Sequence, residues 1–121
     1  LLCFDFGVKK IGICFGETIA GSSTPLPVIK NNSELMKKIK LYVDEWDPDA
    51  FLIGCPSKPS EDFFRQLNIF KENLINEFKL EVIESNEDFT SQIISSEFKK
   101  GEYDSLSAQK IFESWVNTKN E

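Results

Sequence analysis

The chain of 121 residues contains no histidine, the side chain that most often acts as a general acid or base near neutral pH. This absence excludes histidine-dependent catalytic triads and most zinc enzymes. Acid–base work in this protein must therefore fall to carboxylates, lysines or water held by a metal ion.

Arginine is almost as scarce, because Arg65 is the one arginine among 14 cationic residues. Contacts to phosphate would then be made mainly by lysine point charges rather than by the forked guanidinium group. The net charge of −6 argues against a general coat protein for nucleic acid, which would be basic. An enzyme that acts on nucleic acid remains compatible with this charge, since a carboxylate-lined metal site is itself negative.

Cysteine is limited to Cys3, Cys14 and Cys55, which lie far apart in apolar runs. An odd number without paired spacing predicts reduced, buried, structural thiols, and a catalytic cysteine would lack a histidine partner. We find no signal peptide and no apolar run long enough to span a membrane, so we expect a cytoplasmic protein. The chain begins with Leu1 rather than Met, so we expect residues to precede it in the natural protein.

Hydrophobic residues, by contrast, are plentiful at 40%, with 11 phenylalanines, which is enough for one ordinary core. We expect a single domain over residues 1–116 and a loose tail over 117–121. Apolar periodicity predicts strands at 1–6, 10–15, 25–29, 50–53 and 80–83. It predicts helices from a cap at Asn32 or Ser33 to Trp46, and over 61–78, 89–98 and 105–116.

This order of elements predicts an α/β fold with a mixed five-stranded sheet flanked by helices. Three antiparallel strands come first, and βαβ crossovers follow. Ligand sites in such sheets gather at the carboxyl ends of the parallel strands. Asp5, Gly54 and Glu87 would all lie on or near such ends.

The most informative residue is Asp5, a carboxylate inside the first apolar run. An ionised carboxylate in a buried strand is costly unless a positive group compensates it, and a metal ion often does so. Hydrogen bonds from a nearby turn are the structural alternative. We favour the functional interpretation, which predicts metal-dependent phosphate chemistry.

Two further acids join Asp5 as candidates. Taken alone, Glu87 is interpreted as a solvated loop acid and Asp104 as the N-cap of the last helix. Together, one strand-borne acid and two acids from later element ends could form an oxygen-lined pocket for a divalent metal. Mg²⁺ or Mn²⁺ suits such a site, and zinc does not.

Five segments follow one another along nearly the whole chain. The first runs from Phe4 to Gly12, and the other four are Thr24-Pro25-Leu26, Ile53-Gly54-Cys55-Pro56, Asn86-Glu87-Asp88-Phe89-Thr90-Ser91 and Asp104-Ser105-Leu106-Ser107-Ala108. In this order they resemble motifs of the YqgF/RuvX family, whose members are described as RNase H-like Holliday junction resolvases and pre-16S rRNA nucleases. The first segment resembles the family's opening Asp-Phe-Gly-x-Lys-Arg-Ile-Gly motif.

The resemblance implies that Asp5, Glu87 and Asp104 are the catalytic, metal-binding acids of an endonuclease using Mg²⁺ or Mn²⁺. It also implies that substrate phosphate is held by Lys9 and Lys10 and by the hydroxyls of Thr90 and Ser91, although a solvated turn explains the two lysines equally well. The chain departs from the family at Asn86 and Asp88, which replace Asp and Arg, at Lys10, where Arg is usual, and in the short loop 57–60.

The resemblance implies processing of precursor 16S rRNA at its 5′ end, with RNA favoured over DNA and ribosomal precursor particles as partners. Three other functions stay open: a Holliday junction nuclease, a non-catalytic RNase H-like binding module, and an actin-like phosphotransferase. The last needs two such domains, and this chain has room for one. Junction resolution needs a symmetric dimer, whereas RNA trimming needs only a monomer, so we expect a monomer or a weak homodimer.

Overall fold

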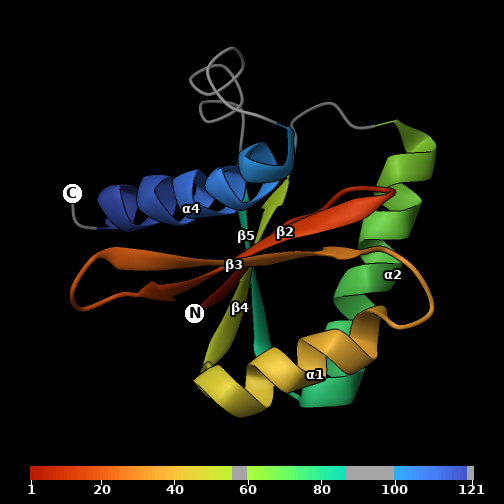
Figure 1. Cartoon of the computed structure of the whole chain (residues 1–121), viewed down its shortest axis with the longest axis horizontal. Helices are drawn as coiled ribbons and strands as arrows, with labels where there is room; N and C mark the ends of the chain where they lie inside the picture. The colour runs from red at the N-terminus through yellow and green to blue at the C-terminus, as the bar shows by residue number, and fades with distance from the viewer. Residues whose placement is uncertain (56–59, 87–99, 120–121) are drawn as a thin grey trace.

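The computed structural model describes residues 1–55, 60–86 and 100–119 of the chain. These residues form a five-stranded sheet in the order β3-β2-β1-β4-β5, with helices on both faces (Figure 1). The elements are β1 (Leu2–Asp5), β2 (Lys10–Glu17), β3 (Ser22–Lys30), α1 (Leu35–Trp46), β4 (Ala50–Cys55), α2 (Glu61–Phe78), β5 (Glu81–Asn86) and α4 (Lys100–Lys119).

The sheet is mixed, as the sequence predicts. β1 lies at its centre, antiparallel to β2 and parallel to β4. β2 and β3 are also antiparallel, and β4 and β5 are also parallel. β3 forms an edge of the sheet, which is where a strand containing Pro25 and Pro27 can be accommodated without loss of ladder hydrogen bonds. The carboxyl ends of β1, β4 and β5 therefore point to the same end of the sheet.

Side chains alternate along β1 between two apolar layers. Leu2 and Phe4 pack in the layer that contains residues of α1 and α2, whereas Cys3 packs in the layer that contains residues of α4. All three are fully buried. The sheet is thus covered on both faces, which explains why its central strands are apolar almost throughout.

Close contact between the sheet and α4 depends on Gly16. A Cβ atom at this position would lie 2.3 Å from the ring of Phe112, a fully buried residue of α4. Any larger residue would push the helix away from the sheet or force the ring out of its rotamer. Gly16 therefore sets how closely α4 packs on β2.

Helix α2 has the bounds that its apolar periodicity predicts, from Glu61 to Phe78. Ser60 caps it, because the serine hydroxyl accepts a hydrogen bond from the backbone nitrogen of Phe63 at 3.1 Å. Glu61 and Asp62 lie in the first turn, where negative charge interacts favourably with the helix dipole.

The predicted start of α1 is wrong. Its N-cap is Glu34, which makes no side-chain capping hydrogen bond. The Asn32 side chain instead accepts a hydrogen bond from the backbone nitrogen of Glu34 at 2.9 Å, so it stabilises the turn before the helix. A short polar side chain supports either arrangement, and the sequence pattern does not separate them.

The predicted start of α4 is also wrong. The helix begins at Lys100, so Asp104 lies within its first turns rather than at an N-cap, and Gly101 is helical instead of belonging to a break. The helix also continues to Lys119, past the point at which a loose tail was expected. The helix is stabilised by packing of its apolar residues on the sheet, although its sequence favours a helix only weakly. These residues are Ala108, Ile111, Phe112 and Val116.

The strands differ from the prediction mainly at their ends, which backbone pairing extends beyond the apolar runs. β3 begins at Ser22, β4 ends at Cys55, and β5 runs from Glu81 to Asn86, whereas β1 ends one residue early, at Asp5. The helix predicted over 89–98 lies outside the described residues. None of the helices in the described ranges is long and apolar enough to cross a membrane.

Candidate active site

Asp5 is the last residue of β1, and its side chain is half-buried. In the sheet it pairs with Gly12 on one side and with Gly54 on the other. Directly paired residues share a face of the sheet, so neither neighbour has a side chain beside the carboxylate. Both glycines are buried.

The strand's alternation places Asp5 on the same face as Cys3, the face covered by α4. The first turns of α4 lie at the end of the sheet where β4 and β5 terminate (Figure 1). Asp104 belongs to these turns, one turn before Ala108, which is fully buried against the sheet. The backbone of Asp104 is thus part of the helix that covers the face on which Asp5 lies.

Three of the other predicted site residues, Glu87, Thr90 and Ser91, lie outside the described part of the chain, and so does the side chain of Asp104. In the described ranges, no three acidic or cysteine side chains come together as a potential metal site. Asp5 is thus the one predicted metal ligand whose side chain the structure describes. The convergence of the three acids remains a prediction.

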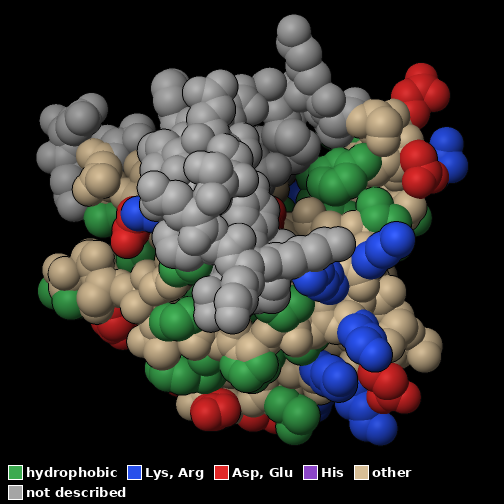
Figure 2. Space-filling view, turned by 45° about the horizontal axis from the view of Figure 1, so that its top comes forward, with side chains coloured by type: hydrophobic (Ala, Val, Ile, Leu, Met, Phe, Trp, Pro, Cys, Tyr) green, Lys and Arg blue, Asp and Glu red, His purple; other side chains and the backbone are tan. Residues whose placement is uncertain are grey.

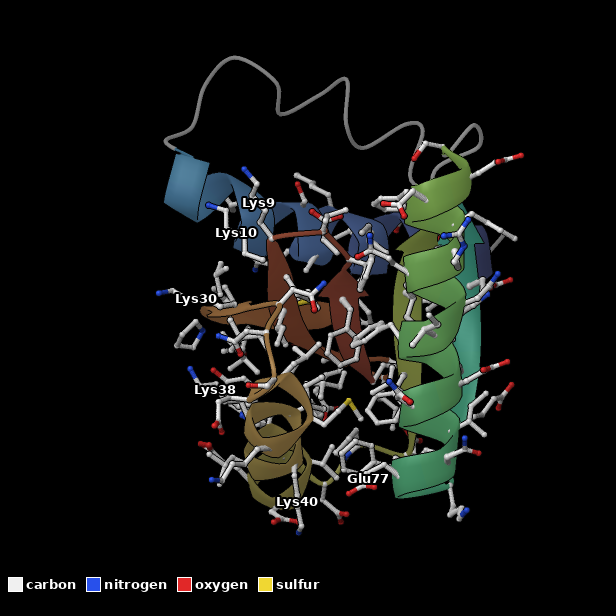
Figure 3. The ribbon with its side chains drawn as sticks, turned by 90° about the vertical axis from the view of Figure 1, so that its right-hand side faces the viewer. Lys9, Lys10, Lys30, Lys38, Lys40 and Glu77 are labelled. Carbon is white, nitrogen blue, oxygen red and sulfur yellow. The ribbon has the colours of Figure 1, made fainter. Side chains whose placement is uncertain are left out.

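Lys9 and Lys10 follow directly after the turn that leaves Asp5. Lys9 is exposed, and Lys10 is half-buried as the first residue of β2. In Figure 3 the two lysines lie at the same end of the molecule as the first turns of α4. Both lysines are therefore close in the fold to the end of β1, as a role in phosphate binding requires.

The turn itself is stabilised by Asn31, a residue that the sequence analysis did not identify. Its backbone nitrogen donates to the carbonyl oxygen of Lys9 at 2.9 Å, and its side-chain amide donates to the carbonyl oxygen of Gly7 at 2.9 Å. A Cβ atom at Gly7 would lie 2.4 Å from the carbonyl oxygen of Lys10, so this turn requires glycine. The only sequence signal for Asn31 is a polar residue at the end of a strand, which also marks an ordinary turn.

A hollow of about 340 Å³ opens between α1 and α2, beside Phe6 and Phe70. Asn31, Asn32 and Gln66 also line it. Phe6 packs in the apolar layer on the face opposite to α4, so the hollow and the Asp5 carboxylate are on different faces of the sheet. The candidate site is therefore an edge formed by strand ends rather than this hollow.

The two described thiols are structural, as predicted. Cys3 and Cys14 are buried and form no disulfide, and they lie opposite each other in the register of β1 and β2. Burial raises the pKa of the Cys3 thiol well above its ordinary value, and the neighbouring Cys14 raises it further. A thiol that stays protonated is a poor nucleophile, so Cys3 has no role in nucleophilic catalysis.

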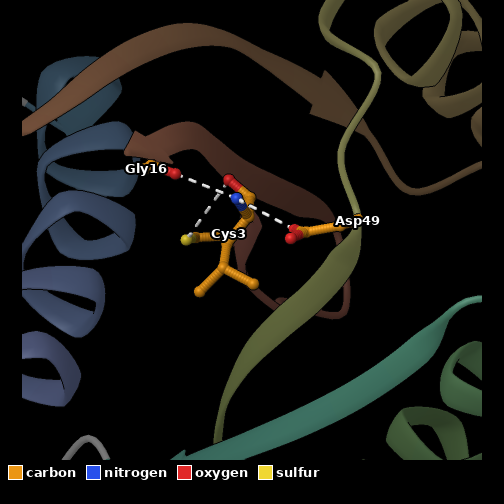
Figure 4. A network of polar contacts seen from close by, with 4 residues as sticks. Cys3, Gly16 and Asp49 are labelled. Carbon is orange, nitrogen blue, oxygen red and sulfur yellow. Dashed lines mark hydrogen bonds and ion pairs between the residues drawn. The ribbon is translucent and has the colours of Figure 1, made fainter. Parts of the chain in front are cut away.

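The contacts drawn in Figure 4 lie at the start of β1, whereas Asp5 is the last residue of that strand. The backbone nitrogen of Leu1 donates to the carbonyl oxygen of Gly16 at 2.9 Å and lies 3.9 Å from a carboxylate oxygen of Asp49. Asp49 is 92% exposed. The network fixes the start of β1 and is separate from the candidate site.

A protein-family model described as "RuvX: Holliday junction resolvase" matches residues 1–118 of the chain. The chain belongs to the RuvX family. A "Putative pre-16S rRNA nuclease" of Buchnera aphidicola subsp. Baizongia pistaciae is 33% identical, over 95% of this chain and 94% of that protein. A protein of the same name from Actinobacillus succinogenes is 31% identical, over 95% and 92%. This RuvX family member is accordingly a nuclease, which is a hydrolase.

Solved structures support the same fold. The structure described as "Crystal structure of Fowlpox virus resolvase and substrate Holliday junction DNA complex" matches with a TM-score of 0.57, covering 99% of this chain and 98% of that chain. The sequence identity is 12%, so the similarity establishes the RNase H-like fold alone. A second structure of the Fowlpox virus Holliday junction resolvase gives a TM-score of 0.52.

Proposed function

We propose that this RuvX family member is a divalent-metal-dependent endonuclease that trims the 5′ end of precursor 16S rRNA in the cytoplasm. The family match over residues 1–118 is the observation that carries the proposal. The names of the relatives from Buchnera and Actinobacillus suggest the substrate. RNA trimming needs a single active site, so a monomer or a weak homodimer suffices.

The donor set fits Mg²⁺ or Mn²⁺, because Asp5, Glu87 and Asp104 offer only carboxylate oxygens, which these ions prefer. Gly12 and Gly54, which pair with Asp5 in the sheet, have no side chains that would compete with an ion for the carboxylate. When bound, the ion supplies Lewis-acid stabilisation of charge on the phosphate and favours ionisation of water. Asp5, on a rigid central strand, would fix the position of this charge.

The substrate backbone would be held by groups around the end of β1. Lys9 and Lys10 would neutralise phosphate charge next to the scissile bond, and Thr90 and Ser91 would donate hydrogen bonds to it. Asp88 reverses the charge of the arginine that is usual in the family motif. The lysines of the turn must therefore supply more of the phosphate binding than in a typical member.

Cleavage of a precursor 16S rRNA fragment with added Mg²⁺ or Mn²⁺ tests this function. The Asp5→Asn variant keeps the shape of the side chain and removes its charge, and Asp49→Asn is the matched control because that side chain is 92% exposed at the other end of the sheet. We expect cleavage by the wild type and by Asp49→Asn, and none by Asp5→Asn. A folded wild type that binds metal without cleaving would support the non-catalytic binding module instead.

The family's description as a Holliday junction resolvase favours a second candidate function, the resolution of Holliday junctions. Cutting two strands symmetrically requires two copies of the active site related by a two-fold axis. A four-way DNA junction in the same assay, together with the mass of the protein in solution, separates the two functions. Paired symmetric cuts by a dimer would favour junction resolution over RNA trimming.

A further inference from the structure

Positive charge is concentrated in the first third of this acidic chain. Residues 1–40 contain six of the 14 cationic and three of the 20 acidic residues, which gives this segment a net charge of +3 while the whole chain has −6. Figure 2 shows Lys and Arg side chains gathered along one side of the face that it draws, with some acidic side chains among them. This asymmetry creates a local positive field on an otherwise negative protein.

Five of these residues define what we call the lysine strip: Lys9, Lys10, Lys30, Lys38 and Lys40. In Figure 3 they follow one side of the molecule, from the turn after β1 past the end of β3 to α1. Lys9, Lys30 and Lys38 form no ion pair within the described residues, whereas Lys40 pairs with Asp44 at 3.1 Å. The strip thus offers at least three lysines to an external anion.

Two members of the strip lie directly opposite each other, because Lys10 pairs with Lys30 where β2 and β3 run antiparallel. Like charges at directly opposed positions destabilise a sheet. The backbone bond from Asn31 to Lys9 brings a third lysine to the same place. Such a cluster concentrates positive charge where a phosphate could bind.

The surroundings of the strip favour contact with a nucleic acid backbone rather than with bases. Single strands are usually bound by aromatic side chains on which bases stack. Of the large apolar side chains exposed in the described ranges, the only aromatic one is Phe64, which belongs to α2 and not to the strip. Val8 and Leu41, which lie beside the strip in sequence, are aliphatic and exposed.

We propose that the lysine strip binds the phosphate backbone of a double-helical arm of the RNA substrate, leading it away from the end of β1 along β3 and α1. Lys10 and Lys30 belong to paired strands, and Lys38 and Lys40 belong to a helix, so these lysines are held rigidly. A rigid set of cations suits the rigid backbone of a duplex better than a flexible single strand. The contacts are independent of base sequence. The link to the active site rests on the proposed nuclease function, but binding by the strip does not.

Binding of an RNA hairpin, measured by fluorescence anisotropy in EDTA across a range of salt concentrations, tests the strip without cleavage. Lys30→Ala and Lys38→Ala each remove one charge and leave Lys9 and Lys10 intact. The matched control is Lys79→Asn, because Lys79 is exposed at the C-cap of α2 with φ of 58° and asparagine tolerates this left-handed conformation. Circular dichroism confirms that each variant is folded.

We expect Lys30→Ala and Lys38→Ala each to weaken hairpin binding roughly 3- to 10-fold and to reduce the salt slope by about 1, and Lys79→Asn to change neither. An unstructured RNA of the same length should bind more weakly than the hairpin. Unchanged binding in both alanine variants, an equal loss in Lys79→Asn, or no hairpin binding by the wild type would each overturn the proposal.

The same proteins separate this proposal from the proposed function. Cleavage that depends on Asp5 while the strip variants bind normally would overturn the strip and leave the nuclease intact. Charge-dependent hairpin binding without any metal-dependent cleavage would support the strip and count against the nuclease.

Discussion

Asp5 lies directly beside Gly54 where the parallel strands β1 and β4 pair, so the carboxylate has no neighbouring side chain on that side. On the other side Asp5 pairs with Gly12, which also has no side chain. A glycine inside a strand weakens the strand and often marks close approach of a ligand. The proposed metal site predicts that the two glycines keep room for a ligand beside the carboxylate.

Replacing Gly54 by alanine tests this explanation. The added methyl group would occupy the space beside Asp5, so we expect nuclease activity to fall roughly 10-fold or more, since small misplacements at a reacting centre are costly. Alanine loses less backbone entropy on folding than glycine, so the thermal midpoint should not fall sharply. Activity at the wild-type level in a folded Gly54→Ala variant would show that this space is not used.

Removal of the Asn31 side chain should loosen the turn that follows Asp5. Asn31→Ala loses the hydrogen bond to the carbonyl oxygen of Gly7, and we expect the free energy of unfolding to fall by about 1 kcal/mol. Asn73→Ala, at an exposed position of α2, is the control and should change stability little. Urea denaturation gives both values, and equal effects of the two substitutions would contradict the assignment of Asn31.

The close packing of Gly16 on Phe112 predicts a strong interaction between the two positions. Gly16→Ala should lower the free energy of unfolding by about 1–3 kcal/mol, because the new methyl group would overlap the ring. Phe112→Leu should be less harmful in the Gly16→Ala background than in the wild type. A double-mutant cycle measures this difference, and strictly additive effects would show that α4 moves away freely.

The buried thiol of Cys3 predicts a dependence of stability on alkaline pH. Its pKa is raised in the folded state, so the folded protein holds this proton more tightly than the unfolded chain does. The resulting stabilisation is complete below the pKa of an unfolded cysteine, about 8.5, and is lost as the pH rises above it. Urea midpoints should therefore fall between pH 7.5 and 10, and fall less in Cys3→Ala. An equal fall in both proteins would rule out a contribution from this thiol.

Much of the fold could be predicted from the sequence, because elements that pack in the core have a clear apolar periodicity. The apolar periodicity of α2 gives correct bounds. The predicted order of three antiparallel strands followed by parallel crossovers is also correct. These features depend on local chemistry that any surrounding fold would preserve.

The start of α4 could not be predicted, because Gly101 and Asp104 normally end or begin helices. Tertiary packing of residues such as Phe112 on the sheet overrides these local preferences. The lysine strip was missed for a different reason. Its members Lys10 and Lys30 are distant in sequence, and only the β2–β3 register brings them together.

Binding of Mn²⁺, followed by electron paramagnetic resonance in wild type, Asp5→Asn and Asp49→Asn, tests most directly whether Asp5 is the centre of a metal site. Free Mn²⁺ gives a strong signal that broadens when the ion is bound. We predict that wild type and Asp49→Asn bind Mn²⁺ alike and that Asp5→Asn loses this binding while remaining folded. Equal binding in all three proteins would contradict the assignment of Asp5.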